Sequence, residues 1–500
     1  MINPYTTNNI IVKYPAPTKD EGVFSLNTKE FCMSILSIPQ SSALLFDTDS
    51  YKVSMPKQYP VGTEIISSYI TSRGGEYTDV MLAGVEFVVK TLQSTKITRE
   101  DVVLAKSFWE AHGEPFYTEG WLKVVDEFDG VIPVTVRALD EGMVYPVQTP
   151  LVVIENAPGF WWLTTWIETM ALRAVWYMTT VATNSFEIKC MINKYLKQSG
   201  DVSGLPFKLH DFGSRGVSSQ ETAMLGGLAH LFNFMGTDTA IALFAANKLF
   251  GAPLDQTAWS IPAAEHSTIT SWTRGNEALA YENMVKQFSK PGSIYAVVSD
   301  SYDIYNAVDN IWGEELRDLV VSSGGTLVIR PDSGDPVVVL PRLLQSLSKK
   351  FGYTINDKGY IVLNNVRLIW GDGINYNTIK SIYRIAVDTM KFSADNLAFG
   401  MGGALLQIVN RDDQKFAMKA SAALINGEWV DVFKNPITDP GKKSMKGRFS
   451  VVLRDGNYVT VPYDENLGDL DLLKIRYHNG EVFDSPDFAT IRARAQSCLV

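Results

Sequence analysis

Six short apolar runs between residues 205 and 404 each end in glycine, aspartate, arginine or histidine, residues that bind phosphate or metal ions or carry protons. Stretches of helical length separate most of these runs, as parallel strands require, because each crossover must return the chain to the same sheet edge. The strand ends of a parallel barrel meet on one face, where its active sites lie. The six segments are 207–216, 259–267, 296–301, 327–335, 368–373 and 397–403.

Arg330 and Asp332 follow the strand expected over residues 326–329. A guanidinium binds phosphate through two parallel hydrogen bonds. A nearby carboxylate accepts hydrogen bonds from a ribose diol or helps to hold Mg²⁺ through water. The structural alternative for this motif is a capped turn with a surface ion pair.

Two glycine turns, at residues 371–373 and 400–403, end successive expected strands. Glycine lets the backbone approach a ligand closely and direct N–H groups at an anion, helped by the following helix terminus. Either turn alone is common in proteins. The two together predict a phosphate cradle.

His266 lies in segment 259–267, where we expect another strand to end, and Asp300 ends the next expected strand. An imidazole acts as acid, base or nucleophile near neutral pH. Asp300 could hold one ring nitrogen while the other faces a substrate. A purely structural histidine is the alternative.

Phe212 and Arg215 share one expected strand end. An aromatic face stacks on a flat heterocycle, and an arginine nearby binds phosphate; a core phenylalanine with a solvated arginine is the alternative. A locally basic stretch in the C-terminal part could also supply charge to a phosphate-rich pocket, although a solvated surface is the default reading. It comprises Arg411, Lys415, Lys419, Lys434, Lys442, Lys443, Lys446 and Arg448.

Bulk composition fits a large, non-membrane protein. The 500 residues are 46% hydrophobic, enough for a large core divided between two domains. The three cysteines are widely spaced and give no zinc signature. Together with the lack of a signal-peptide pattern, they favour the cytoplasm. The net charge of −10 without a basic stripe argues against nucleic acid as a partner. The apolar stretch 159–182 contains Glu168 and Arg173, which indicates a buried helix and not a membrane span.

Strand-like runs lie on both sides of the barrel stretch, so we expect them to pair. The predicted fold is an irregular, TIM-like parallel α/β barrel of residues 200–403, beside a discontinuous β-rich α+β domain of residues 41–199 and 404–500. Residues 1–40 are polar and turn-rich, which predicts a loosely ordered extension; an extra strand over 9–14 is the alternative. Helices are expected over 80–92, 100–112 and 162–196, and strands over 43–46, 64–70, 131–137, 151–155, 415–421, 428–433, 449–453 and 458–461.

Taken together, the motifs resemble the type II phosphoribosyltransferases, the nicotinate phosphoribosyltransferase-like family. The resemblance runs from about residue 44 to about residue 492, nearly the whole chain. Its segments occur in the order found in that family, which makes chance an inadequate explanation. They are 47–53, 162–168, 210–222, 262–270, 299–306 and 329–334.

The resemblance implies condensation of nicotinamide with phosphoribosyl pyrophosphate, giving nicotinamide mononucleotide and pyrophosphate for NAD salvage. Mg²⁺ would neutralise the pyrophosphate leaving group. His266 matches the histidine that this family phosphorylates from ATP, with Asp300 orienting it. ATP would thereby stimulate the synthesis, and the working unit would be a homodimer with shared active sites.

The same resemblance assigns the base-binding residues. Phe212 would stack on one face of the pyridine ring, and Tyr51 of the second subunit on the other. Asp238 would accept a hydrogen bond from the carboxamide and repel a nicotinate carboxylate. Ser260 and Ile261 would complete the base pocket.

Phosphate and ribose binding follow from the same family. The assigned residues are Arg215 and Arg330 for phosphate groups, Asp332 for the ribose hydroxyls, Gly371, Gly402 and Gly403 for the 5′-phosphate, and Arg411, Lys419 and Lys434 from the second subunit.

Three positions depart from the family pattern. Ser214 stands where an aromatic residue is expected, and Ala296 and Ala417 stand where hydroxyls are expected. These departures put base affinity and ATP coupling in doubt without removing the chemical core. The alternatives are the sister reaction with nicotinate, a non-catalytic binding or signalling protein on the same fold, and an unrelated barrel enzyme acting on a sugar phosphate.

Overall fold

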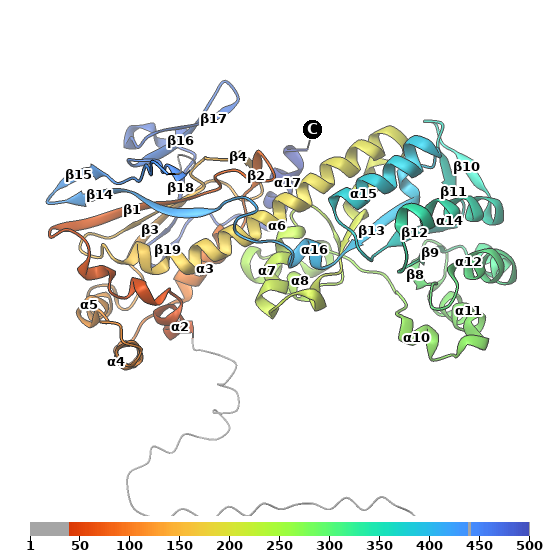
Figure 1. The fold of residues 1–500 in the computed structure, drawn as a ribbon, viewed down its shortest axis with the longest axis horizontal. Helices are drawn as coiled ribbons and strands as arrows, with labels where there is room; N and C mark the ends of the chain where they lie inside the picture. Colours follow the sequence, from red (N-terminus) through yellow and green to blue (C-terminus); the bar gives the residue numbers. More distant parts are fainter. Residues whose placement is uncertain (1–39, 439–441, 500) are drawn as a thin grey trace, which may run out of the picture.

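The computed structural model describes residues 40–438 and 442–499 (Figure 1). The predicted N-terminal extension and the alternative strand over residues 9–14 lie outside this part, apart from residue 40. In the described part no helix is long and apolar enough to cross a membrane.

A six-stranded parallel sheet carries the strand ends that the sequence singled out. Its strand order is β7-β6-β13-β12-β9-β8, and every neighbouring pair is parallel. The strands are rich in Val, Ile and Leu, as expected of parallel strands with both faces covered. They are β6 (Leu209–Asp211), β7 (Gly236–Thr237), β8 (Ile294–Val298), β9 (Thr326–Arg330), β12 (Val366–Trp370) and β13 (Leu397–Met401).

The segment from Trp259 to Ala263 links the two edges of this sheet. Trp259 forms a parallel bridge with Gly236 next to β7, and Ala263 forms one with Ala296 in β8. The sheet therefore curls into an irregular barrel, which confirms the predicted fold class. The strand expected within 259–267 is wrong, because this segment makes only isolated bridges, and the two-residue β7 occupies the sheet edge instead.

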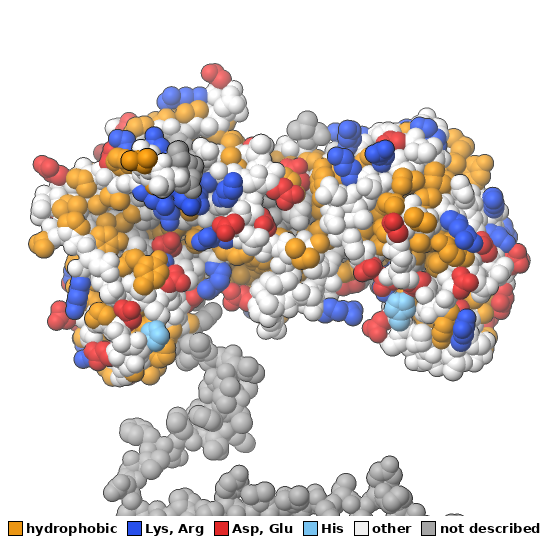
Figure 2. Space-filling view, in the orientation of Figure 1, with side chains coloured by type: hydrophobic (Ala, Val, Ile, Leu, Met, Phe, Trp, Pro, Cys, Tyr) orange, Lys and Arg blue, Asp and Glu red, His pale blue; other side chains and the backbone are white. Residues whose placement is uncertain are grey.

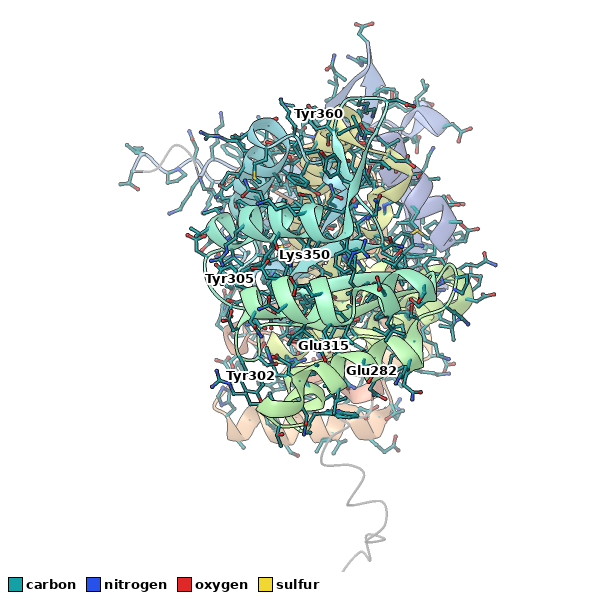
Figure 3. The ribbon with its side chains drawn as sticks, turned by 90° about the vertical axis from the view of Figure 1, so that its right-hand side faces the viewer. Glu282, Tyr302, Tyr305, Glu315, Lys350 and Tyr360 are labelled. Atoms are coloured by element: carbon teal, nitrogen blue, oxygen red, sulfur yellow. The ribbon has the colours of Figure 1, made fainter. Side chains whose placement is uncertain are left out.

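Helices cover the outside of the barrel. Figure 3 shows helices layered across the molecule, with Glu315 of η6 (Ala307–Glu315) between Glu282 of α11 and Lys350 of α14. Helix α14 begins where Asp335 caps its first turn and Pro336 fixes the first helical position. The longer helices are α3 (Val85–Ser94), α4 (Arg99–Ala111), α5 (Thr118–Phe128), α6 (Leu163–Ser199), α7 (Gln220–His230), α8 (Ala240–Phe250), α11 (Glu277–Phe288), α14 (Pro336–Phe351), α15 (Tyr376–Tyr383) and α17 (Phe488–Ser497).

An antiparallel sheet joins the chain segments before and after the barrel, as predicted. Its strand order is β15-β14-β1-β5-β3-β18-β19, with β1 paired to β14 and β3 paired to β18. The 37-residue helix α6 packs against both this sheet and the barrel helix α7 (Figure 1). The strands are β1 (Thr63–Thr71), β3 (Val134–Ala138), β5 (Val152–Asn156), β14 (Ala417–Ile425), β15 (Glu428–Asp431), β18 (Lys474–His478) and β19 (Glu481–Val482).

Two expected elements of this half differ, and two expected strands pair elsewhere. The apolar run 43–46 belongs to helix α2 (Gln40–Phe46), because a four-residue apolar run carries no periodicity that separates helix from strand. The helix expected over 80–92 starts only at Val85, after strand β2 (Asp79–Met81) and a left-handed Gly84. The strands expected over 449–453 and 458–461 are confirmed as β16 (Phe449–Arg454) and β17 (Asn457–Pro462), but they pair with each other in a separate hairpin and do not join the large sheet.

Candidate active site

The mouth of the barrel gathers Arg330 at the end of β9, Asp332 just after it, Asp300 after β8, and His266. His266 is the first residue of the short helix α10 (His266–Thr270), not the end of a strand. Its Nε2 atom lies 3.7 Å from Asp300 Oδ1 and 3.7 Å from Asp332 Oδ2. Its Nδ1 atom lies 3.3 Å from the Ser301 hydroxyl. One nitrogen of a half-exposed imidazole thus faces two carboxylates.

Buried polar atoms without partners surround this histidine. The Asp300 side chain is 4% exposed; its Oδ2 accepts a hydrogen bond from the Ser333 hydroxyl at 2.5 Å, while its Oδ1 has no hydrogen-bond partner in the described part. The buried Arg330 Nε likewise lacks a partner there, and the guanidinium donates to Asp332 at 3.4 Å. Burial raises the pKa of Asp332, against the opposing effect of Arg330. Such groups are suited to bind a charged ligand.

Phe212, Ile261 and the alanine at 296 line the inside of the barrel. Ala296 packs with Val328 and Ile369 in a small apolar cluster, which Phe212 and Ile261 cover. A cavity of about 460 Å³ continues from Ser260 and Ile261 past this cluster toward the opposite barrel end. The departure at Ala296 therefore makes this wall apolar.

Asp238 follows β7 and is exposed. The Ser260 hydroxyl donates to Asp238 Oδ1 at 2.5 Å, so the second carboxylate oxygen remains available as an acceptor. An aromatic ring, an apolar wall and a carboxylate acceptor are groups suited to bind a flat heterocycle with an amide group.

The glycines of the predicted phosphate cradle have two different roles. A Cβ at Gly400 would lie 2.0 Å from the Phe212 ring, so the absence of a side chain there makes room for this ring. A Cβ at Gly371 would lie 3.3 Å from both Phe212 and Asp332. Gly403 has no atom within 4 Å of such a Cβ, and Gly402 only backbone of Phe212 at 3.5 Å. The last two leave backbone accessible to a ligand.

A second group of predicted residues lies on the antiparallel half of the molecule. Burial lowers the pKa of Lys419, and the positive charges of Lys434, Arg73 and Arg411 lower it further, while Glu168 opposes them. The structure thus brings together the three predicted cations and adds Arg73. In Figure 2, blue side chains gather over this half. Within one chain this group lies toward the left of Figure 1, whereas β8, β9 and α10 lie toward the right.

Tyr51 belongs to the same half. It lies in the short helix η1 (Ser50–Lys52), and its side chain is 60% exposed. The next residue, Lys52, is buried and forms ion pairs with Asp49 at 3.4 Å and Glu168 at 3.2 Å. The buried lysine anchors this turn, so that an exposed tyrosine is presented to the outside.

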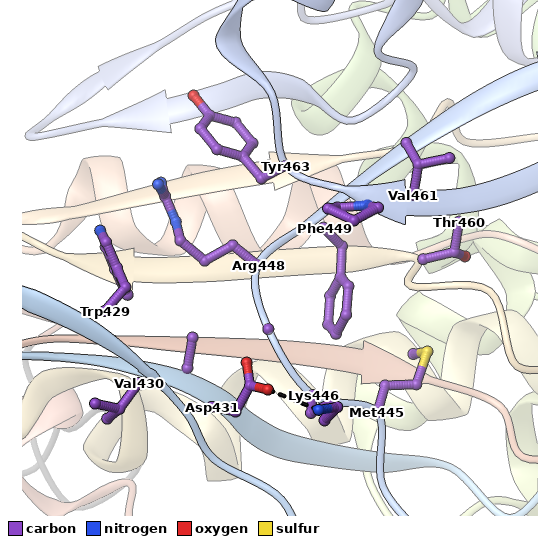
Figure 4. A pocket seen from close by; sticks show the side chains of 13 residues that line it. Trp429, Val430, Asp431, Met445, Lys446, Arg448, Phe449, Thr460, Val461 and Tyr463 are labelled. Carbon is purple, nitrogen blue, oxygen red and sulfur yellow. Dashed lines mark ion pairs between the residues drawn. The ribbon is translucent and has the colours of Figure 1, made fainter.

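The rest of the basic stretch includes structural residues. Arg448 donates two hydrogen bonds of 2.8 Å to Glu155, and its guanidinium lies over the rings of Trp429 and Tyr463. Lys446 pairs with Asp431 at 2.9 Å. These side chains line a cleft of about 760 Å³ (Figure 4), but their charges are already paired.

Sequence reasoning missed Arg73, Ser301 and Ser333. Arg73 follows strand β1 and precedes Gly74 and Gly75, so it carries a strand-end signal of the kind that Arg330 carries at the end of β9. The two serines contact His266 and Asp300 through the fold, and nothing in their spacing indicates this. Arg215, in the short helix η4 (Ser214–Gly216), is exposed beside Ser214.

Comparison with known proteins agrees with this fold. Residues 207–481 match the nicotinate phosphoribosyltransferase (NAPRTase) family, and residues 43–136 match the nicotinamide phosphoribosyltransferase N-terminal domain. A nicotinamide phosphoribosyltransferase of Xanthomonas campestris pv. campestris is 47% identical over 464 residues, covering 91% of this chain and 98% of that protein. One of Mycoplasma pneumoniae is 30% identical, covering 81% of this chain and 95% of that protein.

Solved structures share the fold at low sequence identity. Nicotinate-nucleotide pyrophosphorylase from Pyrococcus furiosus aligns with a TM-score of 0.59 at 16% identity, over 92% of this chain and 96% of its own. Human nicotinic acid phosphoribosyltransferase aligns with a TM-score of 0.53 at 17% identity, over 90% and 93%. The fold and the sequence matches together define a phosphoribosyltransferase of the α/β-barrel type. More particularly, the chain belongs to the nicotinate phosphoribosyltransferase (NAPRTase) family.

Proposed function

We propose that this enzyme condenses nicotinamide with phosphoribosyl pyrophosphate, releasing nicotinamide mononucleotide and pyrophosphate. The pyridine nitrogen forms the new bond to C1′ of the ribose, and the C1′–oxygen bond breaks with its electron pair leaving on pyrophosphate. The observation that carries the proposal is the pairing of a base site, Phe212 with Asp238, and a phosphate site, Arg330 with Asp332, at one barrel mouth. The 47% identical relative from Xanthomonas campestris pv. campestris, which is named nicotinamide phosphoribosyltransferase, supports it.

The base site favours an amide over an acid. Asp238 has one oxygen occupied by Ser260, and its other oxygen can accept a hydrogen bond from the carboxamide NH₂. A nicotinate carboxylate at the same place would face a like charge, which is costly when partly desolvated. Nicotinate is therefore the poorer substrate.

The phosphate site fits Mg²⁺ as a co-reactant. Asp300 Oδ1 is buried without a hydrogen-bond partner, and the Asp332 carboxylate lies beside the same histidine. In the described residues no group of three or more His, Cys, Asp or Glu could hold a metal ion by itself. Mg²⁺ is commonly bound by one or two carboxylates together with substrate phosphates, and Asp300 and Asp332 would supply the carboxylates. The ion would supply charge neutralisation at the leaving group.

ATP would act through His266. One ring nitrogen attacks the terminal phosphorus of ATP, the phosphorus–oxygen bond to ADP breaks, and the phosphoryl group remains on the ring. Asp300 is placed to orient that ring. The added negative charge would help to position the Mg²⁺–pyrophosphate end of the substrate.

The site would be completed by a second subunit. Tyr51 and the cations Arg73, Arg411, Lys419 and Lys434 lie on the half of the chain away from His266 (Figure 1). A two-fold dimer would bring this half of one subunit to the barrel mouth of the other. Tyr51 would then cover the base opposite Phe212.

The direct test measures mononucleotide formation from phosphoribosyl pyrophosphate and Mg²⁺, with nicotinamide and nicotinate in parallel, each with and without ATP. We expect product from nicotinamide, stimulation by ATP, and loss of product when a chelator removes Mg²⁺. Product from nicotinate alone would overturn the substrate assignment. No product from either base would favour a binding protein on the same fold.

A further inference from the structure

Asp211 is a buried carboxylate directly behind the residues that contact the substrates. It ends strand β6 and pairs with Thr237 of β7 on one side and Met401 of β13 on the other. Its side chain has no exposed surface. Because side chains alternate along a strand, Asp211 faces away from the barrel interior that Phe212 lines.

The Asp211 side chain holds the turn that follows it. Its Oδ1 accepts a hydrogen bond from the backbone N–H of Gly213 at 2.7 Å. Such a bond from an aspartate to the N–H two residues later fixes the direction in which the chain leaves the strand. The turn carries Phe212 on one side and leads into Arg215 in helix η4. One side chain therefore sets the position of a base-stacking ring and a phosphate-binding cation.

The same residue is connected to Asp238. The backbone carbonyl of Asp211 accepts a hydrogen bond from the Asp238 N–H at 2.9 Å. The hydroxyl of Thr239, the next residue, lowers the pKa of Asp211, although this hydroxyl and Asp211 Oδ2 have no hydrogen-bond partner in the described part. Asp211 thus lies between the turn after β6 and the end of β7, which carry the two halves of the base site.

The surroundings leave little space for any other arrangement. A Cβ at Gly227 of helix α7 would lie 3.1 Å from Asp211 Oδ2, and one at Gly213 would lie 3.1 Å from Oδ1. Burial raises the pKa of Asp211 to about 6, although the Gly213 N–H and the Thr239 hydroxyl lower it. A buried carboxylate is a costly way to fill a core position, so its value lies in the bonds that it makes.

We infer that Asp211 is a positioning residue of the reaction: it fixes Phe212 and Arg215 relative to Asp238 and so sets the separation of the base and phosphate sites. The inference rests on the proposed function. It predicts a defect in substrate binding and not only in folding, because a misplacement of about 1 Å at a reacting site can cost up to a hundredfold in rate.

The test compares Asp211→Ala, Asp211→Asn and Asp211→Glu with the control Asp471→Ala. Asp471 is also buried and accepts backbone N–H bonds, from Val451 at 3.1 Å and Leu473 at 3.0 Å, but it lies in the antiparallel half. For each protein the KM values for nicotinamide and phosphoribosyl pyrophosphate, kcat and Tm are measured. The control is expected to lower Tm and leave both KM values unchanged.

Asp211→Ala is expected to raise both KM values about tenfold or more, whereas Asp211→Asn, which keeps an oxygen for the Gly213 N–H, stays within about threefold of the wild type. If the alanine variant does not fold, Asp211→Glu serves as the test. This variant keeps the charge but displaces the acceptor oxygen by one methylene, so both KM values should rise. Wild-type KM values in the alanine variant, or in the glutamate variant if only that one folds, would overturn the inference while leaving the proposed function intact. No mononucleotide from the wild type would overturn the proposed function, and the inference with it.

Discussion

The Nε2 atom of His266 lies 3.7 Å from the buried Oδ1 of Asp300. The imidazole is 43% exposed while the carboxylate is 4% exposed, so the histidine is the member of the pair that a ligand can reach. An oriented, accessible imidazole backed by a buried carboxylate is suited to accept a phosphoryl group.

Replacing His266 tests ATP coupling directly. His266→Ala is expected to abolish stimulation by ATP and to retain weak basal synthesis, because the base and phosphate sites remain. The measurement is the initial rate of mononucleotide formation with and without ATP. His478→Ala, which changes an exposed histidine of β18, serves as the control and should respond to ATP as the wild type does. A full ATP response in His266→Ala would contradict the phosphohistidine role.

Asp238 is expected to decide between the two pyridine bases. Asp238→Asn removes the charge that opposes a carboxylate, so the ratio of kcat/KM for nicotinamide to that for nicotinate should fall by at least about tenfold, or 1.4 kcal/mol. Ser260→Ala, which removes the partner of Asp238 but not its charge, should change this ratio much less. Unchanged selectivity in Asp238→Asn would refute the assignment.

A shared site predicts complementation between two inactive variants. Arg330→Ala damages the barrel mouth, and Arg411→Ala damages the cation group on the other half of the chain. In a mixed dimer one site carries both changes and the other carries neither, so random mixing should restore about a quarter of wild-type activity. The measurement is the activity of separately purified variants before and after joint unfolding and refolding, or after co-expression. Sites built within one chain would show no recovery.

Much of this architecture could be predicted because the signals are local. Five of the six barrel segments contain the end of a strand, as expected, because an apolar run followed by Gly, Asp or Arg marks the end of a parallel strand. The strand predicted over 43–46 was wrong because tertiary contacts decide the structure of this run. The indole N–H groups of Trp109 and Trp166 donate hydrogen bonds to the carbonyls of Leu45 and Leu44. The proximity of Arg73 to Lys419 could not be found from sequence, because the two residues are 346 positions apart and meet only through the pairing of β1 with β14.

Thr273 is held in a backbone conformation that favours glycine, with φ 69° and ψ 158°. A β-branched residue there stores strain on the order of 1–3 kcal/mol. Thr273→Gly should therefore raise the free energy of unfolding by roughly 1 kcal/mol, after allowance for the greater backbone entropy of glycine in the unfolded chain. Denaturant unfolding measures this. Ser271→Gly, at a position with φ −61° and ψ −21°, should lower stability instead.

The ionisation of Glu141 should lower the free energy of unfolding as the pH rises. Its buried carboxylate accepts backbone N–H bonds from Gly84, Val85 and Glu86 at the start of α3. Burial and then the charge of Glu86 raise its pKa from 4.5 to about 7. The folded state therefore holds this proton more tightly than the unfolded chain, so the stabilising contribution is complete below pH 4.5 and disappears as the pH passes 7.

Glu141→Gln cannot titrate, so it should lack this part of the pH dependence, even though its amide supports α3 less well and lowers stability overall. The difference in unfolding free energy between wild type and variant should shrink between pH 5 and pH 8, by at most about 1.4 kcal/mol per pH unit. Glu100→Gln, on the exposed face of α4, should leave the pH dependence as it is in the wild type. Parallel pH profiles for wild type and Glu141→Gln would mean that Glu141 stays ionised in the fold, stabilised fully by the three N–H groups that it accepts.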